Sequence, residues 1–497
     1  MTKKSLDQLP EVFVSDKTIT HLVHRELGRG RLRKLASRLY TKNLTDSPVA
    51  LIKRHLWLLV GSYFPNGLIS DRTALENAPA SDGSIFLISS KKRSVTLPGI
   101  TICPRQGCAP LESDKPFING LRLSSTARAF LENMVPSRAT KGKCPRTLSR
   151  KEIEIRLEKL LQQGGEEALK RLRDEMREIS PKLKREREFS RLDSLIGTLL
   201  GTQEVDLESD LARSRKKGIP YDSKRLDYFS LLFTELKQYS PLLRPEQPVG
   251  REICAFYEAY FSNFIEGTEF AVDEAKEIIF EGKIPRDRPQ DAHDIIGTFR
   301  LVSDETEMHK TPSTFDQLLT LLKSRHATIM GQRPNKHPGQ LKTQENRAGT
   351  TVFVSPDLVL GTLKKGYEFY QALDEPFQRA VYIMYLISEV HPFTDGNGRL
   401  GRVMMNAELV AAGETRLIIP TIFRNNYMVA LKAIAQANRA SPLIRTLDFS
   451  QKYTHSIDWS SLESAQKYLE TTNAFFDPND ADLRGIRLIL PPPEGIS

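Results

Sequence analysis

The sequence predicts a multidomain chain with an N-terminal α+β region, a helical connector and a mainly α C-terminal region that carries a β-hairpin flap. Its 497 residues exceed what one hydrophobic core usually serves, so two or three domains are expected. Short β-rich runs occur in the N-terminal part, whereas longer apolar stretches at helical spacing dominate the C-terminal part. Charged sequence rich in Glu, Arg, Lys and Leu lies between them. We place the N-terminal α+β region at residues 1–145, the helical connector at residues 146–245, the mainly α region at residues 246–460 and a C-terminal extension at residues 461–497.

The N-terminal part begins with a basic stretch. Between residues 18 and 41 the pattern indicates a helix, a glycine break, a second helix and a short strand, which is the outline of a small winged helix-turn-helix. Glu26 is the only acid in this stretch, and the whole chain carries a formal net charge of +10. The basic side chains could contact DNA phosphates, with candidates at Arg29, Arg31, Arg33 and Lys34. A solvated basic face is the alternative.

Residues 15 to about 205 resemble transcriptional-regulator antitoxins of the abortive-infection AbiEi type. The similarity is carried by three segments, Leu-Arg-Lys-Leu-Ala-Ser-Arg-Leu-Tyr-Thr at residues 32–41, Leu-Ile-Ser-Asp-Arg-Thr-Ala-Leu at residues 68–75, and Leu-Ile-Gly-Thr-Leu-Leu-Gly-Thr at residues 195–202. The resemblance implies a winged-helix regulatory domain that binds DNA. It also raises the alternative that a toxin and an antitoxin are fused in one chain.

Further elements of the N-terminal part and the connector follow from their composition. A helix is expected at Val49–Val60, and β-rich runs are expected at Ser84–Ser89 and Val95–Ile102. Residues 146–188 carry leucines at helical spacing among many charged residues. This pattern predicts amphipathic helices with one solvated face.

The most informative segment, His391 to Arg402, has the sequence His-Pro-Phe-Thr-Asp-Gly-Asn-Gly-Arg-Leu-Gly-Arg. The apolar stretch Pro376–Val390 before it predicts a buried helix, and Pro392 disfavours its continuation, so the chain is expected to turn at His391. A second helix is expected at Arg399–Ala412. Phosphates bound in this segment would lie at a helix N-terminus, where unpaired N–H groups favour negative charge.

The side chains of this segment suit phosphate chemistry. A histidine whose pKa lies near neutrality can accept a hydroxyl proton, which makes His391 a candidate base. Asp395 offers a hard oxygen ligand for Mg²⁺. Arg399 and Arg402 are three residues apart, so they share a helix face and can bind separate phosphate oxygens. The glycines on either side of Asn397 let backbone N–H groups converge on an anion.

Every fixed position of this segment matches the signature His-x-Phe-x-Asp/Glu-Gly-Asn-Gly-Arg-x-x-Arg, so the C-terminal part resembles Fic-domain proteins and is expected to have the mainly α Fic fold. The resemblance implies a protein adenylyltransferase, which transfers AMP from ATP to a Ser, Thr or Tyr hydroxyl of a target protein. It assigns the general base to His391, the Mg²⁺ ligand to Asp395, and the phosphate contacts to Gly396, Asn397, Gly398, Arg399 and Arg402. The alternatives are a decayed enzyme that keeps its fold, or a DNA-binding regulator whose Fic domain is a silent nucleotide-binding module.

A shorter motif lies upstream. The sequence Ser-Asn-Phe-Ile-Glu-Gly at residues 262–267 has the form Ser/Thr-x-x-x-Glu-Gly/Asn, which is found in the inhibitory helix of many Fic proteins. Residues 249–265 show helical spacing, so Ser262 and Glu266, four apart, share a face. The resemblance implies an inhibitory helix at residues 250–267 with Ser262, Glu266 and Gly267 as its functional residues, and with Glu266 paired to Arg402 where the terminal phosphate should bind. An ordinary surface glutamate is the alternative.

Between the two motifs, residues 326–354 are rich in Gly, Pro and polar residues and end in the β-branched run Thr350–Val354. This pattern predicts a loop followed by an edge hairpin. In Fic proteins a hairpin flap here docks an extended segment of the target by main-chain pairing. A plain surface loop is the alternative. We expect His326 and His337 to be structural or solvated rather than catalytic.

Composition limits the remaining possibilities. No apolar run reaches membrane length, and no signal peptide is visible after the start Met-Thr-Lys-Lys-Ser. Four cysteines are too few and too scattered for a disulfide scaffold or a zinc site. We therefore expect a cytoplasmic protein that does not enter a membrane, and the sequence leaves a homodimer open.

Overall fold

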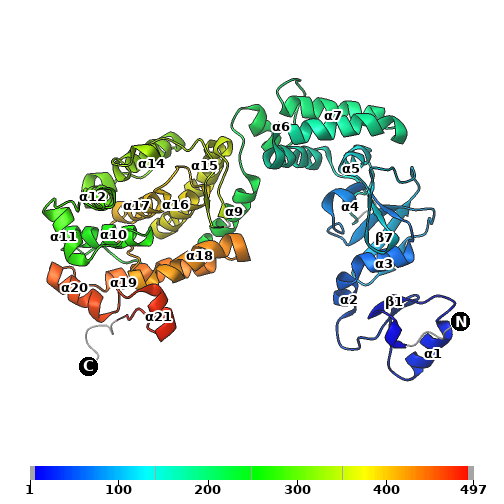
Figure 1. Ribbon diagram of the computed structural model, residues 1–497, viewed down its shortest axis with the longest axis horizontal. Helices are drawn as coiled ribbons and strands as arrows, with labels where there is room; N and C mark the ends of the chain where they lie inside the picture. Colours follow the sequence, from blue (N-terminus) through cyan, green and yellow to red (C-terminus); the bar gives the residue numbers. More distant parts are fainter. Residues whose placement is uncertain (1–5, 140–141, 248, 350, 491–497) are drawn as a thin grey trace. The chain divides into compact units, whose positions relative to one another are not determined.

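A computed structural model describes residues 6–139, 142–247, 249–349 and 351–490 (Figure 1). The chain divides into two compact units, Met1–Lys217 and Gly218–Ser497, called here the N-terminal and C-terminal units. The division falls inside the expected connector, because helix α6 (Arg150–Leu183) packs within the N-terminal unit and α9 (Ser223–Lys237) packs within the C-terminal unit. Thr350, in the expected hairpin, and residues 491–497, in the expected extension, lie outside the described residues.

The N-terminal unit begins with a small antiparallel sheet beside helix α1 (Thr20–Gly28). Its strands lie in the order β1 (Val12–Val14), β3 (Leu39–Thr41), β2 (Arg33–Ala36). The second helix expected between residues 31 and 41 is therefore wrong. Arg, Lys, Leu and Ala favour a helix locally, but a turn at Arg38, whose φ is 62°, folds the segment into a hairpin that pairs with β1. The expected helix-turn-helix order does not form at this position.

A six-stranded mixed sheet follows, in the order β6-β7-β5-β4-β9-β8. Its strands are β4 (Leu68–Ile69), β5 (Ser84–Ile88), β6 (Val95–Leu97), β7 (Ile100–Arg105), β8 (Lys115–Pro116) and β9 (Arg122–Leu123). Strand β5 pairs parallel to β7 and β4 pairs parallel to β9, while the other pairs are antiparallel. All five residues of β5 are buried. The two β-rich runs expected from the sequence are confirmed.

Helices complete the N-terminal unit. They are α2 (Pro48–Arg54), α3 (Leu56–Tyr63), α4 (Asp71–Glu76), α5 (Thr126–Asn133), α6, α7 (Glu186–Leu199) and α8 (Asp210–Lys216). The single helix expected at Val49–Val60 is two helices, which meet at His55. Helix α6 starts with a capping box between Ser149 and Glu152 and is interrupted at Gly165. Its buried leucines pack against α5 and α7, which confirms the expected amphipathic helices.

The C-terminal unit is almost entirely helical. Its helices are α9, α10 (Arg251–Ile265), α11 (Val272–Phe280), α12 (Pro289–Ser303), α13 (Glu305–Met308), α14 (Phe315–Ile329), α15 (Pro356–Gln371), α16 (Pro376–Val390), α17 (Asn397–Ala411), α18 (Arg424–Ala437), α19 (Ser441–His455), α20 (Leu462–Thr471) and α21 (Pro478–Arg484). One hairpin, β10 (Arg347–Ala348) with β11 (Thr351–Val352), lies among the helices. The loop expected from residue 326 starts later, because His326–Ile329 belongs to α14.

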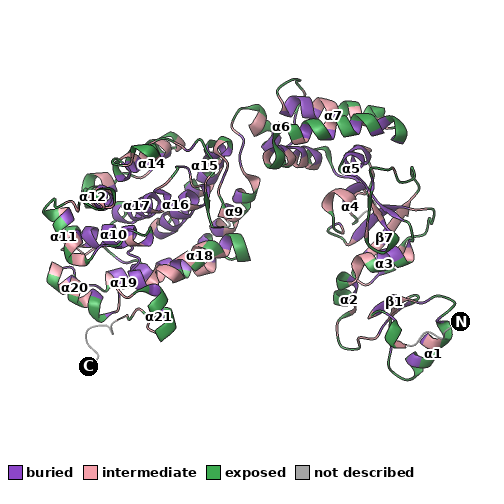
Figure 2. Ribbon diagram, viewed as in Figure 1, coloured by how far each residue is buried: buried purple, intermediate pink, exposed green. Residues whose placement is uncertain are grey.

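Helices α16 and α17 form the centre of the C-terminal unit, and Figure 2 shows both almost entirely buried. Helix α16 has the predicted bounds, whereas α17 begins at Asn397, two residues before the predicted start. Near the end of the expected C-terminal extension, Leu488 and Leu490 pack against the core, so this described part of the extension is held in place. None of the helices within the described residues combines the length and the apolar character that a membrane crossing requires.

Candidate active site

His391 lies at the C-cap of α16 in the left-handed conformation, with φ 53° and ψ 60°, so the chain turns where Pro392 predicts. Its Nδ1 lies 3.2 Å from the carbonyl oxygen of Ser388. A carbonyl can only accept a hydrogen bond, so Nδ1 carries the proton and Nε2 keeps a free lone pair. Burial lowers the pKa of His391 to about 4, which leaves the ring neutral at neutral pH. The side chain is therefore in the form that accepts a proton.

The segment around the hairpin holds His391 from one side. The ring of Phe353 stacks on the imidazole, with centroids 3.7 Å apart and planes at 7°. The backbone N–H of Lys342 donates to the carbonyl of Pro392 over 2.9 Å, and its ammonium donates to Asn346, whose amide donates to the carbonyl of Phe393. Burial lowers the pKa of Lys342 to about 8. Sequence analysis did not identify Phe353, Lys342 or Asn346.

The loop between α16 and α17 is closed by its own side chains. Asn397 accepts from the backbone N–H of Phe393 and donates to the same residue's carbonyl, both over 2.9 Å, so its side chain closes the loop. Gly396, with φ 74°, is the helix N-cap. His326 donates from Nε2 to the carbonyl of Asp395 over 3.0 Å, because its Nδ1 accepts from the N–H of Gly339. His326 is thus structural, as expected.

Asp395 is the candidate metal ligand. Its Oδ1 accepts from the N–H of Gly396 over 2.7 Å, and its Oδ2 lies 3.4 Å from Nζ of Lys336. Burial would raise the pKa of Asp395, but the Gly396 N–H and the Arg399 charge outweigh it and the pKa is lowered. The described residues contain no group of three or more His, Cys, Asp or Glu that could hold a metal ion. A single ionised carboxylate nevertheless fits Mg²⁺, which usually takes most of its ligands from water and substrate phosphates.

Arg402 in α17 is held by the upstream motif in α10. Its Nε donates to the Ser262 hydroxyl over 2.9 Å, and its Nη2 donates to the Ser262 carbonyl over 2.8 Å and to Glu266 Oε1 over 2.7 Å. The expected contact between Glu266 and Arg402 is present. Burial would raise the pKa of Glu266, but Arg402, together with Arg399 and His391, outweighs burial and lowers the pKa, so the carboxyl is ionised. Gly267 follows with φ 90° and turns the chain away from the helix.

Glu266 also occupies the space above Gly398. A Cβ built on Gly398 would lie 2.2 Å from Glu266 Oε1 and 3.2 Å from Nη1 of Arg402. The carboxylate therefore rests on the first turn of α17, beside the N–H groups that would otherwise face an anion. A side chain at position 398 would fill this space, which accounts for the glycine.

Arg399 is held by residues that sequence analysis did not identify. Its Nη1 lies 2.6 Å from Oδ2 of Asp294 in α12 and donates to Oδ1 of Asn263 in α10 over 3.3 Å. Both arginines of the segment therefore contact α10. Asp294 has no signature spacing to either motif, so only the packing of α12 against α10 and α17 reveals it.

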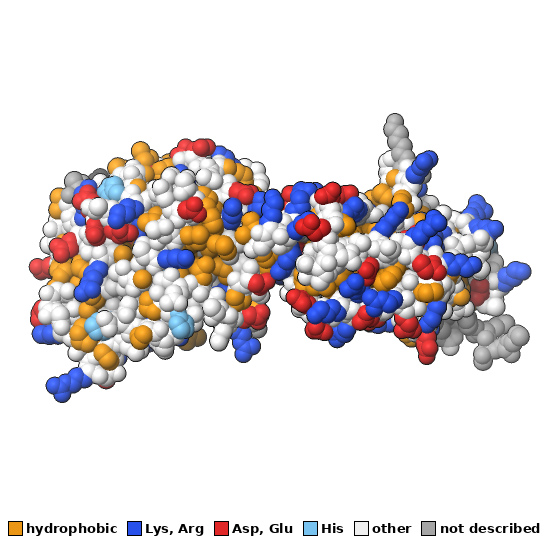
Figure 3. Space-filling view, turned by 90° about the horizontal axis from the view of Figure 1, so that it is seen from above, with side chains coloured by type: hydrophobic (Ala, Val, Ile, Leu, Met, Phe, Trp, Pro, Cys, Tyr) orange, Lys and Arg blue, Asp and Glu red, His pale blue; other side chains and the backbone are white. Residues whose placement is uncertain are grey.

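The candidate DNA-binding residues of the N-terminal unit have a different setting. Arg29 and Arg31, together with Arg25, form ion pairs with Glu26, whose side chain is only 1% exposed. Arg33 donates to the carbonyl of Asp46, and Lys34 is exposed. Basic and acidic side chains also lie interspersed on the face drawn in Figure 3. The positive charge of this region is thus partly neutralised by its single acid.

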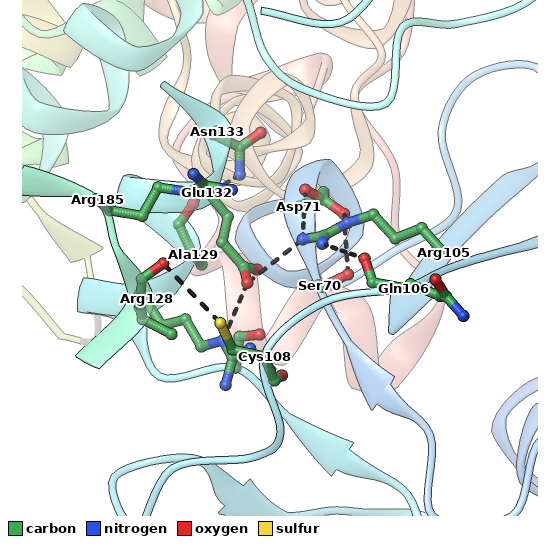
Figure 4. Close-up of polar contacts among 12 residues, drawn as sticks. Ser70, Asp71, Arg105, Gln106, Cys108, Arg128, Ala129, Glu132, Asn133 and Arg185 are labelled. Carbon is green, nitrogen blue, oxygen red and sulfur yellow. Dashed lines mark hydrogen bonds and ion pairs between the residues drawn. The ribbon is translucent and has the colours of Figure 1, made fainter. Parts of the chain in front are cut away.

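A second cluster of buried charges lies in the N-terminal unit (Figure 4). Arg105 contacts Asp71 through Nε at 2.6 Å and Glu132 through Nη2 at 3.3 Å. Arg128 contacts Asp114 and Glu132 at 2.7 and 3.0 Å. These residues come from β7, α4, α5 and the loop before β8, so the cluster ties the sheet to two helices. Arg146 also forms an ion pair with Asp71, so three arginines face three carboxylates, which is typical of a structural network.

Part of the C-terminal unit, including the His391–Arg402 segment, is similar to known proteins. Residues 315–409 match the model of the Fic/DOC family. Protein adenylyltransferase fic-1 of Caenorhabditis elegans is 26% identical over 200 residues, which cover 38% of this chain and 38% of that protein. Protein adenylyltransferase Fic of Nematostella vectensis is 26% identical over 254 residues, which cover 48% of this chain and 57% of that protein. The chain thus spans less than two thirds of the length of these relatives.

Solved structures give a weaker likeness. The structure of residues 134–508 of Fic-1 from Caenorhabditis elegans is 19% identical, covers 65% of this chain and 97% of that chain, and has a TM-score of 0.35. A TM-score of this size establishes no relationship by itself. The resemblance of residues 15 to about 205 to AbiEi-type regulators is not confirmed and stays a prediction.

Proposed function

Because the chain carries a Fic domain, we propose that it is a protein adenylyltransferase, which transfers AMP from ATP to a Ser, Thr or Tyr hydroxyl of a target protein. The observation that carries this proposal is His391, which is neutral, has a free Nε2 and lies in the loop that leads into the N-terminal turn of α17, where Arg399 and Arg402 lie. A base and an anion site are thereby joined by one short loop.

In the proposed reaction, Nε2 of His391 accepts the proton of the target hydroxyl. The hydroxyl oxygen attacks the α-phosphorus of ATP and forms a phosphodiester, while the bond to the β-phosphate oxygen breaks and pyrophosphate leaves. The Ser388 carbonyl keeps the proton on Nδ1, and the Phe353 ring fixes the plane of the imidazole. These two contacts orient the lone pair before the target arrives.

Anionic phosphates would bind at the start of α17. The backbone N–H groups of its first turn and the guanidinium groups of Arg399 and Arg402 supply donors, and no side chain at Gly398 obstructs them. Asp395 would hold Mg²⁺, which supplies positive charge to the phosphate oxygens when it is bound. Lys336 would have to release the carboxylate first.

We also propose that the enzyme is autoinhibited by Glu266. Glu266 takes Nη2 of Arg402 and lies against Gly398, which is where a phosphate would bind. A carboxylate and a phosphate cannot both take this donor without strong repulsion between them. Glu266 is a third exposed on its side chain, so it can leave without crossing the core. Inhibition by Glu266 is thus reversible.

The decisive experiment uses the Glu266→Gly protein with ATP labelled either at the α-phosphate or at the γ-phosphate. We expect label on protein only from the α-phosphate, and none when His391→Ala is added. Label from the γ-phosphate would make the protein a phosphotransferase. If the protein binds ATP but transfers no label to any protein of a cell extract, it is better described as a silent nucleotide-binding module.

The N-terminal unit keeps a second candidate role in DNA binding, because the side chains of Arg29 and Arg31 are more than half exposed although Glu26 holds them. Phosphate contacts by these residues would show as affinity that falls steeply with salt. The full chain with Arg29→Glu and Arg31→Glu should then lose binding to duplex DNA at low salt. Equal DNA binding by the wild type and this variant would show that Arg29 and Arg31 do not contact DNA.

A further inference from the structure

Arg399 enters the site with one end of its guanidinium already fixed. Nη1 contacts Asp294 at 2.6 Å and Asn263 at 3.3 Å. The ion pair is almost fully buried, with 4% of the Arg399 side chain and 2% of the Asp294 side chain exposed. A buried pair of this kind holds its geometry, because separating the charges would leave each one unpaired in the protein interior.

The other end of the same guanidinium lacks an oxygen acceptor. Within the described residues Nε has no hydrogen-bond partner, and Nη2 reaches only the thioether sulfur of Met330, at 3.4 Å. In the described part of the chain, a buried Nε without a hydrogen-bond partner also occurs in four other arginines, so this atom alone does not mark a binding site; they are Arg33, Arg122, Arg225 and Arg416. Arg399 differs because it lies in the first turn of α17, where its charge acts on both Asp395 and Glu266.

Asp294 is itself bound from a second side. Nε of Arg333 donates to its two carboxylate oxygens over 3.0 and 2.9 Å, and Nη2 of Arg333 lies 2.9 Å from Oδ2. Arg333 continues to Asp291, one helical turn before Asp294 in α12, at 2.7 Å. Two arginines therefore share one carboxylate, which leaves Asp294 no room to turn away from Arg399.

Glu266 and Asp294 thus differ in the freedom of their carboxylates. Glu266 is a third exposed and lies at the C-cap of α10, whereas Asp294 is buried in the middle of α12 between two arginines. We propose that Asp294 is a positioning residue, which holds Nη1 of Arg399 so that Nε and Nη2 face the phosphates of a nucleoside triphosphate. The role rests on the proposed function. In this proposal Glu266 is an inhibitor that can leave Arg402, whereas Asp294 is a fixed support of Arg399.

The test compares two isosteric changes on α12 in the Glu266→Gly protein. Asp294→Asn keeps the size of the side chain but removes the charge that holds Arg399. We expect the Kd for ATP, measured by calorimetry, to rise roughly tenfold or more, as for the loss of a charge-assisted contact, while the Kd for AMP stays unchanged. The matched control Asp291→Asn breaks only the more exposed contact to Arg333 and should leave both constants within about twofold.

Two further variants keep the result interpretable. If the Asp294→Asn protein does not fold, Arg333→Gln can replace it, because Arg333 contacts the same carboxylate from the other side. This variant should change the ratio of ATP to AMP affinity in the same direction, but by a smaller factor. In a double-mutant cycle, Asp294→Asn and Arg399→Lys should be non-additive in ATP affinity, because Asp294 acts through Arg399.

Three results would overturn the role. They are an unchanged ratio of ATP to AMP affinity in a folded Asp294→Asn protein, additivity in the cycle, and increased transfer when Asp294→Asn is made with Glu266 intact. The last would make Asp294 a second inhibitor. Failure of the Glu266→Gly parent to bind ATP would instead refute the proposed function, so the two failures are distinguishable.

Discussion

Arg128 in the N-terminal unit and Arg402 in the C-terminal unit are both buried arginines held by carboxylates, yet their acids differ. Arg128 donates to Glu132, to Asp114 and to the carbonyls of Cys108 and Ala109, and Figure 4 shows it beside Glu132 and Cys108. The side chains of Arg128 and Asp114 are both 0% exposed. Arg402 is 5% exposed, but its partner Glu266 is 33% exposed. The ion pair alone therefore does not tell a structural contact from a displaceable one; the exposure of the acid does.

The two sites also differ in how an unpaired atom can be satisfied. In the N-terminal cluster, Oε2 of Glu132 has no hydrogen-bond partner among the residues that the structure describes, and burial, followed by the charge of Asp71, raises the pKa of Glu132. A carboxyl in that position can take up a proton. In the C-terminal site the unpaired atom is Nε of Arg399, and a guanidinium does not lose its proton in proteins. It can be satisfied only by an acceptor, such as a water molecule or a phosphate oxygen.

The largest expected effect separates chemistry from folding in the C-terminal unit. His391→Ala, made in the Glu266→Gly protein, should lower transfer by about 10²–10⁴-fold, which is the usual contribution of a general base. The free energy of unfolding should fall by only about 1 kcal/mol, because the side chain loses its stacking contact with Phe353. Transfer is measured with α-labelled ATP and unfolding with urea. Retained transfer would show that His391 is not the base.

A stability effect should dominate in the N-terminal unit. Asp114→Ala removes one partner of Arg128 and the acceptor of the backbone N–H groups of Leu111 and Ser125. Breaking a buried pair in this way should cost about 3–5 kcal/mol, seen as faster hydrogen exchange in peptides from α5. Glu266→Gly is the control, because it removes a more exposed acid, and it should lower the free energy of unfolding far less than Asp114→Ala. Equal costs would refute the contrast between the two sites.

Changes at Glu266 should alter activity more than stability. Glu266→Gly should raise transfer by roughly 5–150-fold, the usual range for a coupling between two states of a site. Glu266→Asp should give an intermediate rate, because a side chain one methylene shorter reaches Arg402 less well. Initial rates at matched ATP and Mg²⁺ measure both. Equal labelling by the wild type and Glu266→Gly would leave Glu266 an ordinary helix residue.

The smallest expected effect is that of pH. Arg402 holds the pKa of Glu266 below its usual value of 4.5, so the ion pair is complete above that value and is lost only as pH falls through the lowered pKa. The pKa of His391 is lowered to about 4, so the base is neutral above that range. Between about pH 6 and about pH 8, kcat/KM for ATP should change by less than about twofold. A tenfold rise per pH unit would contradict both assignments.

Sequence analysis determined the elements whose signals are local. Pro376 and Pro392 predicted both ends of α16, and the four-residue spacing of Ser262 and Glu266 predicted their common face. The contact of that face with Arg402 was predicted from the family resemblance, not from the spacing. Helical spacing also predicted α6. These predictions succeeded because each depends on residues a few positions apart. The second N-terminal helix failed for the opposite reason. Residues 33–36 pair with β3, and β3 also pairs with the distant strand β1, so strand pairing overrode the local helical preference.

Only the tertiary structure decided how the candidate site is supported. Asp294, Phe353 and Lys342 come from α12 and the region around the hairpin, and nothing in their local sequence marks them. The structure also shows that the side chain of Asn397 closes the loop, a contact that sequence analysis did not predict. The motif by itself determined which groups can do the chemistry, since these must be particular residue types at short spacing. Which acids hold the arginines, and which of them can leave, depends on burial, and burial is set by helices far apart in the chain.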